Sequence, residues 1–306
     1  AARFLDTTSV VVATANGVLI LDASDGRHRS TVQVPLLPVA VAPLSPTEWM
    51  LLAANGALLR MRARVEGDDS YTTHARLPTG RNLATAPHAR YALVSGLGPD
   101  AWLVPLAGGT NVRLATADRN VSAVALSPDG ATAVTACGST ALDEGLRDYT
   151  LLIWDVATGR QREKLDVLSF PAALTFLADG SLVVATSVGQ MFHVELDEGG
   201  FQIKATFARP GVTGPTEEAH AQAVNAVASD PTGRLLVTAA GGTSTVGNEV
   251  AVWDVATRTR RWLHAGYERR PLGVDVAPDG SALLVVEPAS GRLELWGPLE
   301  ALGRAP

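Results

Sequence analysis

The stretch "LLIWDVATGRQ", which begins at Leu151, has a near copy, "VAVWDVATRTR", which begins at Val250. The two Trp-Asp pairs lie about 100 residues apart, which is too long for one small repeat and fits two repeats of about 40–50 residues. A degenerate copy is therefore expected between them. The segment "FLADGSLVVATSVGQMFHVELDEGG" from Phe176 has the same order of turn, apolar run, turn, apolar run and acidic residue. The chain is thus built on an internal repeat.

Extending this register over the 306 residues predicts seven units that fill the chain. The equivalent positions are Leu21, Met61, Leu106, Trp154, Leu196, Trp253 and Trp296. The corresponding unit boundaries are 1–35, 36–78, 79–117, 118–167, 168–208, 209–265 and 266–306, and we expect all seven to form a single domain.

Each unit consists of short apolar runs with strand character, separated by turn signals. In "VSAVALSPDGATAVTAC" from Val121, a Ser-Pro-Asp-Gly turn separates two such runs. Pro presets φ and Gly tolerates positive φ, so this segment predicts a tight connection between antiparallel strands. The segments "LADG" from Leu177, "DPTG" from Asp230 and "APDG" from Ala277 repeat the turn. Helical periodicity is not sustained, and the fold class is therefore all-β.

The segments "ALSPDG", "LLIWDVATG", "VAVWDVAT" and "VAPDG…LELWG" resemble the WD-repeat β-propellers. The resemblance is strong in three units, weak in four, and covers the whole chain. It implies a seven-bladed β-propeller of four-stranded antiparallel blades that closes into a ring. It also implies that the Trp-Asp pair ends the third strand of a blade, where the aromatic ring packs between sheets and the acid begins the next turn.

The family's hydrogen-bonded set of His, Ser or Thr, Asp and Trp can be carried over only in part. The fourth unit has Ala117 at the position of the His, and the sixth has Gly247 at the position of the Asp. No unit is expected to have all four members, so packing should stabilise the blades instead. His220 is either a structural histidine of its own blade or a residue that contacts a ligand. The residues assigned structural roles are Thr135, Asp148, Trp154, Asp155, Thr238, Trp253, Asp254 and Trp296.

Signals of catalysis, cofactor binding or metal binding are missing from the sequence. The six histidines form no H-E-x-x-H pattern, and Cys137 is the single cysteine. There is no phosphate-binding loop and no nucleophile elbow. The acidic run "EGDDS" from Glu66 is interpreted as a solvated turn rather than a cation site. We therefore expect no enzymatic activity, no cofactor and no metal.

Charge and hydropathy narrow the partners and the compartment. The formal net charge of −6 disfavours general nucleic-acid binding. The longest apolar run, "VPLLPVAVAPL" from Val34, is too short for a membrane span. A cytoplasmic protein is predicted, or a periplasmic or secreted one if Ala1 is a cleaved mature N-terminus.

Four long connections carry the functional prediction: residues 137–148, 209–222, 241–249 and 264–271. In a propeller, connections of these types emerge on one face, and these four belong to consecutive blades, the fourth to the seventh. They combine charged residues with an aromatic residue of the kind that is enriched at protein interfaces. The predicted partner-binding residues are Asp143, Glu144, Arg147, Glu217, His220, Tyr267, Arg269 and Arg270. Replacing Tyr267 and Arg270 together by Ala is expected to weaken partner capture and leave thermal stability nearly unchanged.

The sequence thus predicts a non-catalytic platform for protein interaction or sensing, as one domain or subunit of a larger bacterial-type protein or assembly. The alternative is a secreted or periplasmic propeller that binds a small ligand, or acts as an enzyme, over its central channel.

Two structural expectations complete the prediction. The last blade has little sequence after Trp296 for an outermost strand, so that upstream residues or another chain would supply this edge. Cys137, at the end of a predicted second strand, is expected to be buried.

Overall fold

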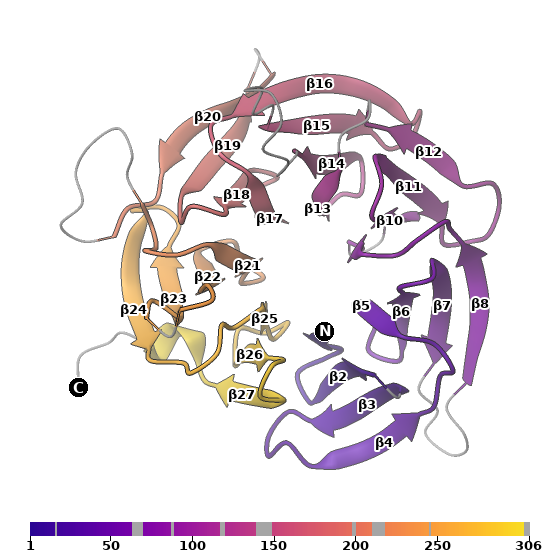
Figure 1. Cartoon of the computed structure of the whole chain (residues 1–306), viewed down its shortest axis with the longest axis horizontal. Helices are drawn as coiled ribbons and strands as arrows, with labels where there is room; N and C mark the ends of the chain where they lie inside the picture. Colours follow the sequence, from indigo (N-terminus) through magenta and orange to yellow (C-terminus); the bar gives the residue numbers. More distant parts are fainter. Residues whose placement is uncertain are drawn as a thin grey trace. The chain divides into compact units, whose positions relative to one another are not determined.

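The computed structural model describes residues 1–15, 17–62, 70–86, 89–116, 120–138, 149–197, 200–209, 218–244 and 246–302. Nearly all regular structure in these residues is β-strand, and the exception is one 3₁₀ turn, η1 (Leu299–Ala301). The strands follow one another along the chain in seven sheets, which are the blades of a seven-bladed β-propeller (Figure 1).

Blade 1 contains β1 (Ala2–Phe4), β2 (Ser9–Thr14), β3 (Gly17–Asp22) and β4 (His28–Val32). Blade 2 contains β5 (Pro38–Ser45), β6 (Glu48–Ala53), β7 (Ala57–Arg62) and β8 (Ser70–Arg76). Blade 3 contains β9 (Asn82–Ala84), β10 (Tyr91–Ser95), β11 (Asp100–Pro105) and β12 (Val112–Ala115).

Blade 4 contains β13 (Val121–Leu126), β14 (Thr132–Cys137), β15 (Tyr149–Asp155) and β16 (Arg160–Val167). Blade 5 contains β17 (Pro171–Phe176), β18 (Leu182–Thr186), β19 (Met191–Asp197) and β20 (Gly200–Thr206). Blade 6 contains β21 (Val224–Ser229), β22 (Leu235–Ala240), β23 (Glu249–Asp254) and β24 (Thr259–Ala265). Blade 7 contains β25 (Gly273–Val276), β26 (Leu283–Glu287) and β27 (Arg292–Trp296).

The chain divides into two compact units. Unit 1 comprises Ala1–Thr135 and Leu152–Arg162, and unit 2 comprises Ala136–Leu151 and Glu163–Pro306. The division falls within the fourth sheet, so that blades 1–3 belong to unit 1 and blades 5–7 to unit 2. The assignment of the chain to a single domain stays a prediction.

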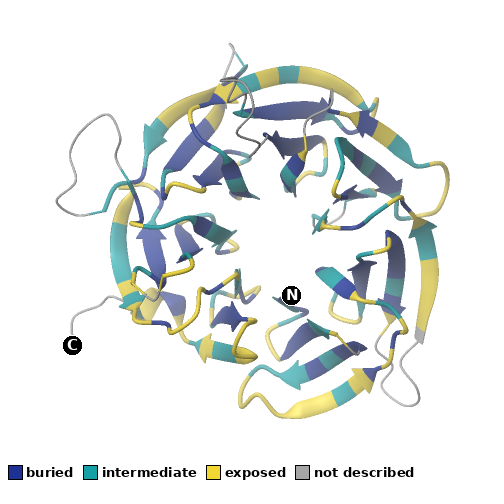
Figure 2. Cartoon of the chain, viewed as in Figure 1, coloured by how far each residue is buried: buried dark blue, intermediate teal, exposed yellow. Residues whose placement is uncertain are grey.

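Burial within a blade is graded from the middle strands to the outer strand. All residues of β22 and nearly all of β23 are buried, whereas β24 has only exposed and half-buried residues (Figure 2). The middle strands therefore read as continuous apolar runs, since both of their faces are covered. Cys137 ends the fully buried strand β14, and its predicted burial is confirmed.

The predicted tight turns join the first and second strands of the blades. In blade 4, Ser127 accepts a backbone bond from Gly130 (2.8 Å), and Gly130 has φ +69°. The carboxylate of Asp129 accepts bonds from Ser127 Oγ (2.5 Å) and from the Ala131 amide (3.0 Å). The glycine supplies the positive φ and the aspartate satisfies the turn's donors, which explains the Ser-Pro-Asp-Gly pattern.

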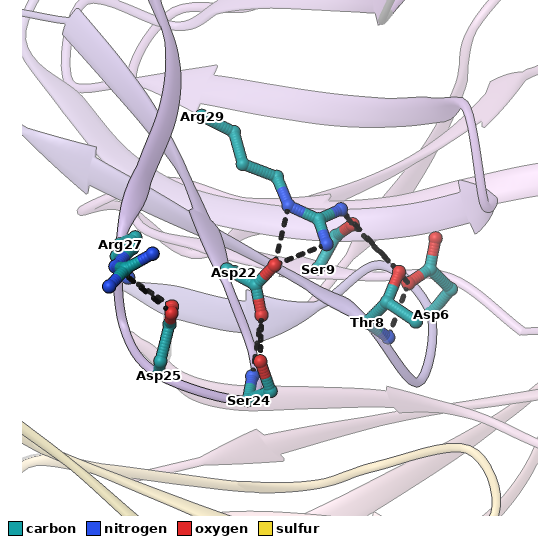
Figure 3. A network of polar contacts seen from close by, with 8 residues as sticks. All are labelled: Asp6, Thr8, Ser9, Asp22, Ser24, Asp25, Arg27 and Arg29. Atoms are coloured by element: carbon teal, nitrogen blue, oxygen red, sulfur yellow. Dashed lines mark hydrogen bonds and ion pairs between the residues drawn. The ribbon is translucent and has the colours of Figure 1, made fainter.

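An acid at the end of the third strand organises the next turn, as the resemblance implied. Asp22 Oδ1 accepts bonds from the Ser24 amide (2.8 Å) and hydroxyl (2.5 Å), while its other oxygen binds Arg29 Nη2 at 2.6 Å (Figure 3). Arg29 also donates to Ser9 Oγ (2.8 Å), so the network joins β4 to the start of β2. The Ser24 hydroxyl, and then Arg29, hold the pKa of Asp22 well below its usual range. Asp155 and Asp254 accept equivalent bonds from Thr158 and Thr257.

Blade 7 has three strands in the described part of the chain, one fewer than each other blade. Leu299–Ala301, where an outer strand could have formed, is instead the turn η1, with Leu299 buried. The expectation of a thin last blade is therefore confirmed up to Leu302. The source of a fourth strand stays a prediction.

The pairing of β27 predicts fast hydrogen exchange at its outer edge. The Leu272 amide donates to Val286 O (2.9 Å), so Val286 points its backbone groups away from β27. Val286 lies opposite Leu293, and backbone direction alternates along a strand; Leu293 and Leu295 therefore direct their amides away from β26. We expect these two amides to exchange much faster than the Glu294 amide when measured by NMR. Protection of Leu293 and Leu295 would show that another strand covers this edge.

Candidate protein-interaction face

A buried polar set joins two strands of blade 6, β22 and β23, to the connection that precedes β21. Trp253 Nε1 donates to Thr238 Oγ1 at 2.9 Å, and Thr238 Oγ1 lies 2.7 Å from His220 Nε2. His220 Nδ1 lies 2.6 Å from Glu249 Oε1. Because an ionised carboxylate only accepts, we assign the proton to Nδ1, which leaves Nε2 to accept from the Thr238 hydroxyl. His220, Thr238 and Trp253 are fully buried.

This set corrects the expectation that no blade would have four members. The acid is missing at position 247, as the sequence analysis stated, but Glu249 fills its place from the first residue of β23. Its side chain is one methylene longer than that of Asp, which lets it reach the histidine from a shifted position.

The proposal of His220 as a partner-binding residue also needs correction. Its exposed fraction is 0 %, and both ring nitrogens have partners within the blade. The side chain therefore has no surface to offer a partner and takes the structural role that was its alternative interpretation.

His220 predicts a pH dependence of stability. Burial lowers the pKa of His220, and the hydrogen bond and charge of Glu249 oppose this shift only in part. Below about pH 6.5 the unfolded chain binds a proton at this residue that the folded chain does not, so stability is present above that pH and is lost as the pH falls.

We expect the free energy of unfolding, measured with urea between about pH 7 and pH 5, to fall less steeply in His220→Gln than in the wild type. His28 lies on β4 and is exposed, so His28→Gln is the matched control and should keep the wild-type slope. Equal slopes for the wild type and His220→Gln would contradict the prediction.

Blade 4 repeats part of this arrangement. Trp154 Nε1 donates to Thr135 Oγ1 at 3.1 Å, and both residues are buried. Asp148 and Ala117, the other positions considered for this blade, lie outside the described residues.

Tyr267 also has a different position from the one expected, because its side chain packs in the interior. It is 3 % exposed, and its hydroxyl donates to Glu294 Oε2 at 2.8 Å, the same oxygen that accepts from Trp296 Nε1 at 3.0 Å. Its ring lies edge-on to that of His264, with centroids 5.1 Å apart. Burial and the Glu294 carboxylate raise the pKa of the Tyr267 hydroxyl. Tyr267 therefore joins blades 6 and 7 and is not available as a binding anchor.

The surface of interest consists of the connections at one end of the strands of unit 2. In a four-stranded antiparallel sheet, the turn from second to third strand and the exit of the fourth strand lie at the same end. We call this surface the loop face of unit 2. Its described residues are 138, 168–170, 187–190, 207–209, 218–223, 241–244, 246–248, 266–272 and 288–291.

Hydrogen bonds tie successive connections of the loop face together. The Ser187 amide donates to Phe170 O (2.9 Å), and the amides of Ala219 and His220 both donate to Gly189 O (3.0 Å each). A side chain at Gly189 would collide with His220 O, since a Cβ there would lie 2.1 Å away and φ is +82°. This close approach of two connections requires a glycine.

The same pattern continues from blade 6 to blade 7. Asn248 Nδ2 donates to Tyr267 O (3.2 Å), and Asn225 Nδ2 donates to Gly241 O (3.0 Å) and Pro271 O (3.2 Å). The Arg269 amide donates to the buried carboxylate of Glu287 (2.7 Å). The loop face is thus a hydrogen-bonded layer on a rigid set of strands.

This layer exposes four large aliphatic side chains. Their exposed fractions are 83 % for Leu168, 51 % for Val188, 76 % for Val246 and 41 % for Leu272. The other exposed large hydrophobic residues described in unit 2 are Ile203, Leu263 and Leu295, which lie on the strands β20, β24 and β27. Unit 1 shows the same preference, with Leu37 and Leu97 exposed on connections of these two types.

The turns at the opposite end of unit 2 are polar and locally satisfied. Asp179, Asp230 and Asp279 accept bonds from Ser181, Thr232 and Ser281, respectively. No large hydrophobic residue is exposed on the described turns of this end. Among the described residues, the two ends of unit 2 therefore differ in chemistry, because large apolar side chains are exposed on the connections of the loop face and not on the opposite turns.

The remaining partner-binding predictions have two outcomes. Arg269 and Arg270 are exposed on the loop face, in the connection between β24 and β25. Four others lie outside the described residues, namely Asp143, Glu144, Arg147 and Glu217. The exposed aliphatic residues were not predicted from the sequence. For Val188 and Val246 the signal was an apolar residue inside a connection that is otherwise polar or glycine-rich.

In the part of the chain that the structure describes, no three His, Cys, Asp or Glu side chains gather in a group that could hold a metal ion. None of the described helical structure is long and apolar enough to cross a membrane.

The seven blades form a β-propeller, and the polar set in blade 6 resembles that of the WD-repeat propellers. The family model "WD domain, G-beta repeat" matches residues 213–254, which contain His220, Thr238, Glu249 and Trp253. The matched repeat and the seven-bladed fold together support the WD-repeat β-propeller family.

Two solved structures share the fold over nearly the whole chain. Hydrazine synthase of Kuenenia stuttgartiensis is similar with a TM-score of 0.75 and 15 % identity, over 97 % of this chain and 94 % of that one. A chain of a mitotic checkpoint complex is similar with a TM-score of 0.75 and 12 % identity, over 97 % of this chain and 88 % of that one. At these identities the likeness shows the fold alone. A comparison with curated proteins finds no match.

Proposed function

We propose that the protein is a non-catalytic interaction platform whose protein partner binds the loop face of unit 2. The main observation behind this proposal is that four large aliphatic side chains are exposed at this end of unit 2, on connections that are hydrogen-bonded to one another: Leu168, Val188, Val246 and Leu272. Exposed apolar side chains that gather on one rigid surface mark protein interaction sites. WD-repeat propellers are commonly interaction scaffolds, and that general role supports the proposal.

The proposal includes the setting that the sequence predicts. The chain would act as one domain or subunit of a larger bacterial-type assembly, with the cytoplasm as its compartment. The large aliphatic side chains would supply the apolar centre of the interface, and the flanking polar connections would form its rim.

Site-specific photo-crosslinking tests where a partner binds. A benzophenone amino acid replaces Val246 on the loop face or, as the control, Arg258, which is exposed on the opposite turn of the same blade. We expect a discrete protein adduct from position 246 in extracts of the source cells, and none from position 258.

The captured protein is then purified and its affinity is measured by calorimetry. Val246→Asp with Leu272→Asp should weaken binding at least about tenfold. The matched control, Ala178→Asp with Ala256→Asp on the opposite turns, should bind as the wild type does. Binding that follows the control pair instead would place the interface at the opposite end, and the proposal would be wrong.

A further inference from the structure

The loop face of unit 2 carries two neighbouring guanidinium groups without an acidic partner among the described residues. Arg269 and Arg270 are both exposed, and neither forms an ion pair there. Other arginines of unit 2 have such partners: Arg292 lies 2.5 Å from Glu294, and Arg209 lies 3.4 Å from Glu218. With the exposed Glu268, the connection 266–272 carries two guanidinium groups and one carboxylate, an excess of positive charge on a chain whose formal net charge is −6.

The backbone that carries these arginines is fixed on both sides. Tyr267 and Pro271 are buried, and their carbonyl oxygens accept bonds from Asn248 and Asn225. The Arg269 amide is bound to Glu287, whose carboxylate is also held by the Ser290 hydroxyl. The Gly266 amide donates to Asn248 O (3.2 Å). Because the connection is held at these points, binding would order the two side chains and not the loop, which lowers its entropic cost.

Exposed aliphatic side chains lie on the same pair of connections. Leu272 lies two residues after Arg270, and Val246 belongs to the connection that Asn248 bonds to this one. Binding along a nucleic-acid backbone depends on positive charge and does not use aliphatic side chains, whereas exposed apolar surface marks protein interaction sites. A basic segment would place like charges against the arginines at an energetic cost.

Building on the proposed function, we propose that the partner segment bound at blades 6 and 7 is an acidic peptide with large apolar anchors. Its apolar side chains would cover Val246 and Leu272. Its carboxylates would pair with Arg269 and Arg270, for which the planar guanidinium fork is well suited.

An unbiased peptide library displayed on phage tests this inference, with the full chain as bait. We expect enriched sequences that hold at least two Asp or Glu residues beside a Leu, Ile, Phe or Trp. A synthetic consensus peptide labelled with fluorescein should then bind in anisotropy measurements. Replacing its acidic residues by Lys should abolish the binding.

Charge reversal on the protein completes the test. Arg269→Glu with Arg270→Glu should weaken binding of the consensus peptide more than about tenfold. Arg234→Glu with Arg258→Glu, two exposed arginines on the opposite turns, is the matched control and should bind normally. Enrichment of neutral or basic peptides, no enrichment, or binding that survives the reversal at 269 and 270 would overturn the inference. If a serine-phosphorylated form of the consensus peptide bound more than about tenfold tighter than the unphosphorylated peptide, the site would be one for phosphate, and the inference would again be overturned.

The two proposals fail in distinguishable ways. Peptide binding that survives the charge reversal at 269 and 270 but is abolished by Val246→Asp with Leu272→Asp would support the loop face as the binding surface. It would contradict the inference that the partner segment is acidic. Peptide binding that is unaffected by both pairs of substitutions would contradict the proposed function and the further inference together.

Discussion

Replacing Trp253 by Ala should lower the free energy of unfolding by about 3–5 kcal/mol. The side chain is fully buried between blades 5 and 6, with its ring edge-on to Phe207 at 6.1 Å and to His220 at 5.5 Å between centroids. Truncation leaves a cavity and removes the donor to Thr238 Oγ1. Urea unfolding followed by circular dichroism measures the loss.

A half-buried tryptophan in the same blade provides the comparison. Trp262→Ala, on the outer strand β24, should cost clearly less than Trp253→Ala, because Trp262 is only half-buried. Equal losses for the two variants would contradict the account of blade packing.

The Tyr267→Ala variant should lose about 3 kcal/mol of stability. Tyr267 is buried beside Trp296 and His264, and its hydroxyl is bonded to Glu294. Tyr267→Phe keeps the ring and removes the hydroxyl, while Glu294 keeps its bond to Trp296, so it should lose only about 1 kcal/mol. Thermal and urea unfolding of the two variants check both values.

Arg270→Ala is the control for the Tyr267 prediction. Arg270 is exposed, so its replacement should change stability by no more than about 0.5 kcal/mol. The double variant that the sequence analysis expected to be neutral should therefore be destabilised through Tyr267 alone. A stable Tyr267→Ala variant would restore the original interpretation.

The repeat architecture could be predicted because it depends on local signals. The Trp-Asp segments and the Ser-Pro-Asp-Gly turns determine where strands end, and each turn is satisfied within a few residues, as Asp129 shows.

The assignments of single residues were less predictable, because they depend on contacts between distant parts of the chain. Tyr267 lies in a polar stretch of sequence, and its burial follows from Glu294 and Trp296, which lie on another blade. Glu249 was not predicted as a member of the polar set, because the family's usual spacing places the acidic residue at position 247. An acidic residue at the start of a buried third strand was the signal that could have found it.

The exposure of the aliphatic side chains could not be predicted from the sequence either. Leu168 and Val188 look like core residues by type, and only the geometry of the connections turns them outward. Of the four exposed aliphatic residues of the loop face, only Val246 lies in one of the long connections chosen from the sequence, whose charged and aromatic members were emphasised instead. Of these, Arg269 and Arg270 are exposed where the prediction placed them.

Hydrogen exchange of unit 2, measured by mass spectrometry with and without the purified crosslinked partner, tests the central claim most directly. The account predicts that the partner slows exchange in the loop-face segments 187–190, 241–244 and 266–272. It predicts no change in the opposite turns 178–181, 231–234 and 255–259. Protection of those turns, with the loop-face segments unchanged, would contradict it.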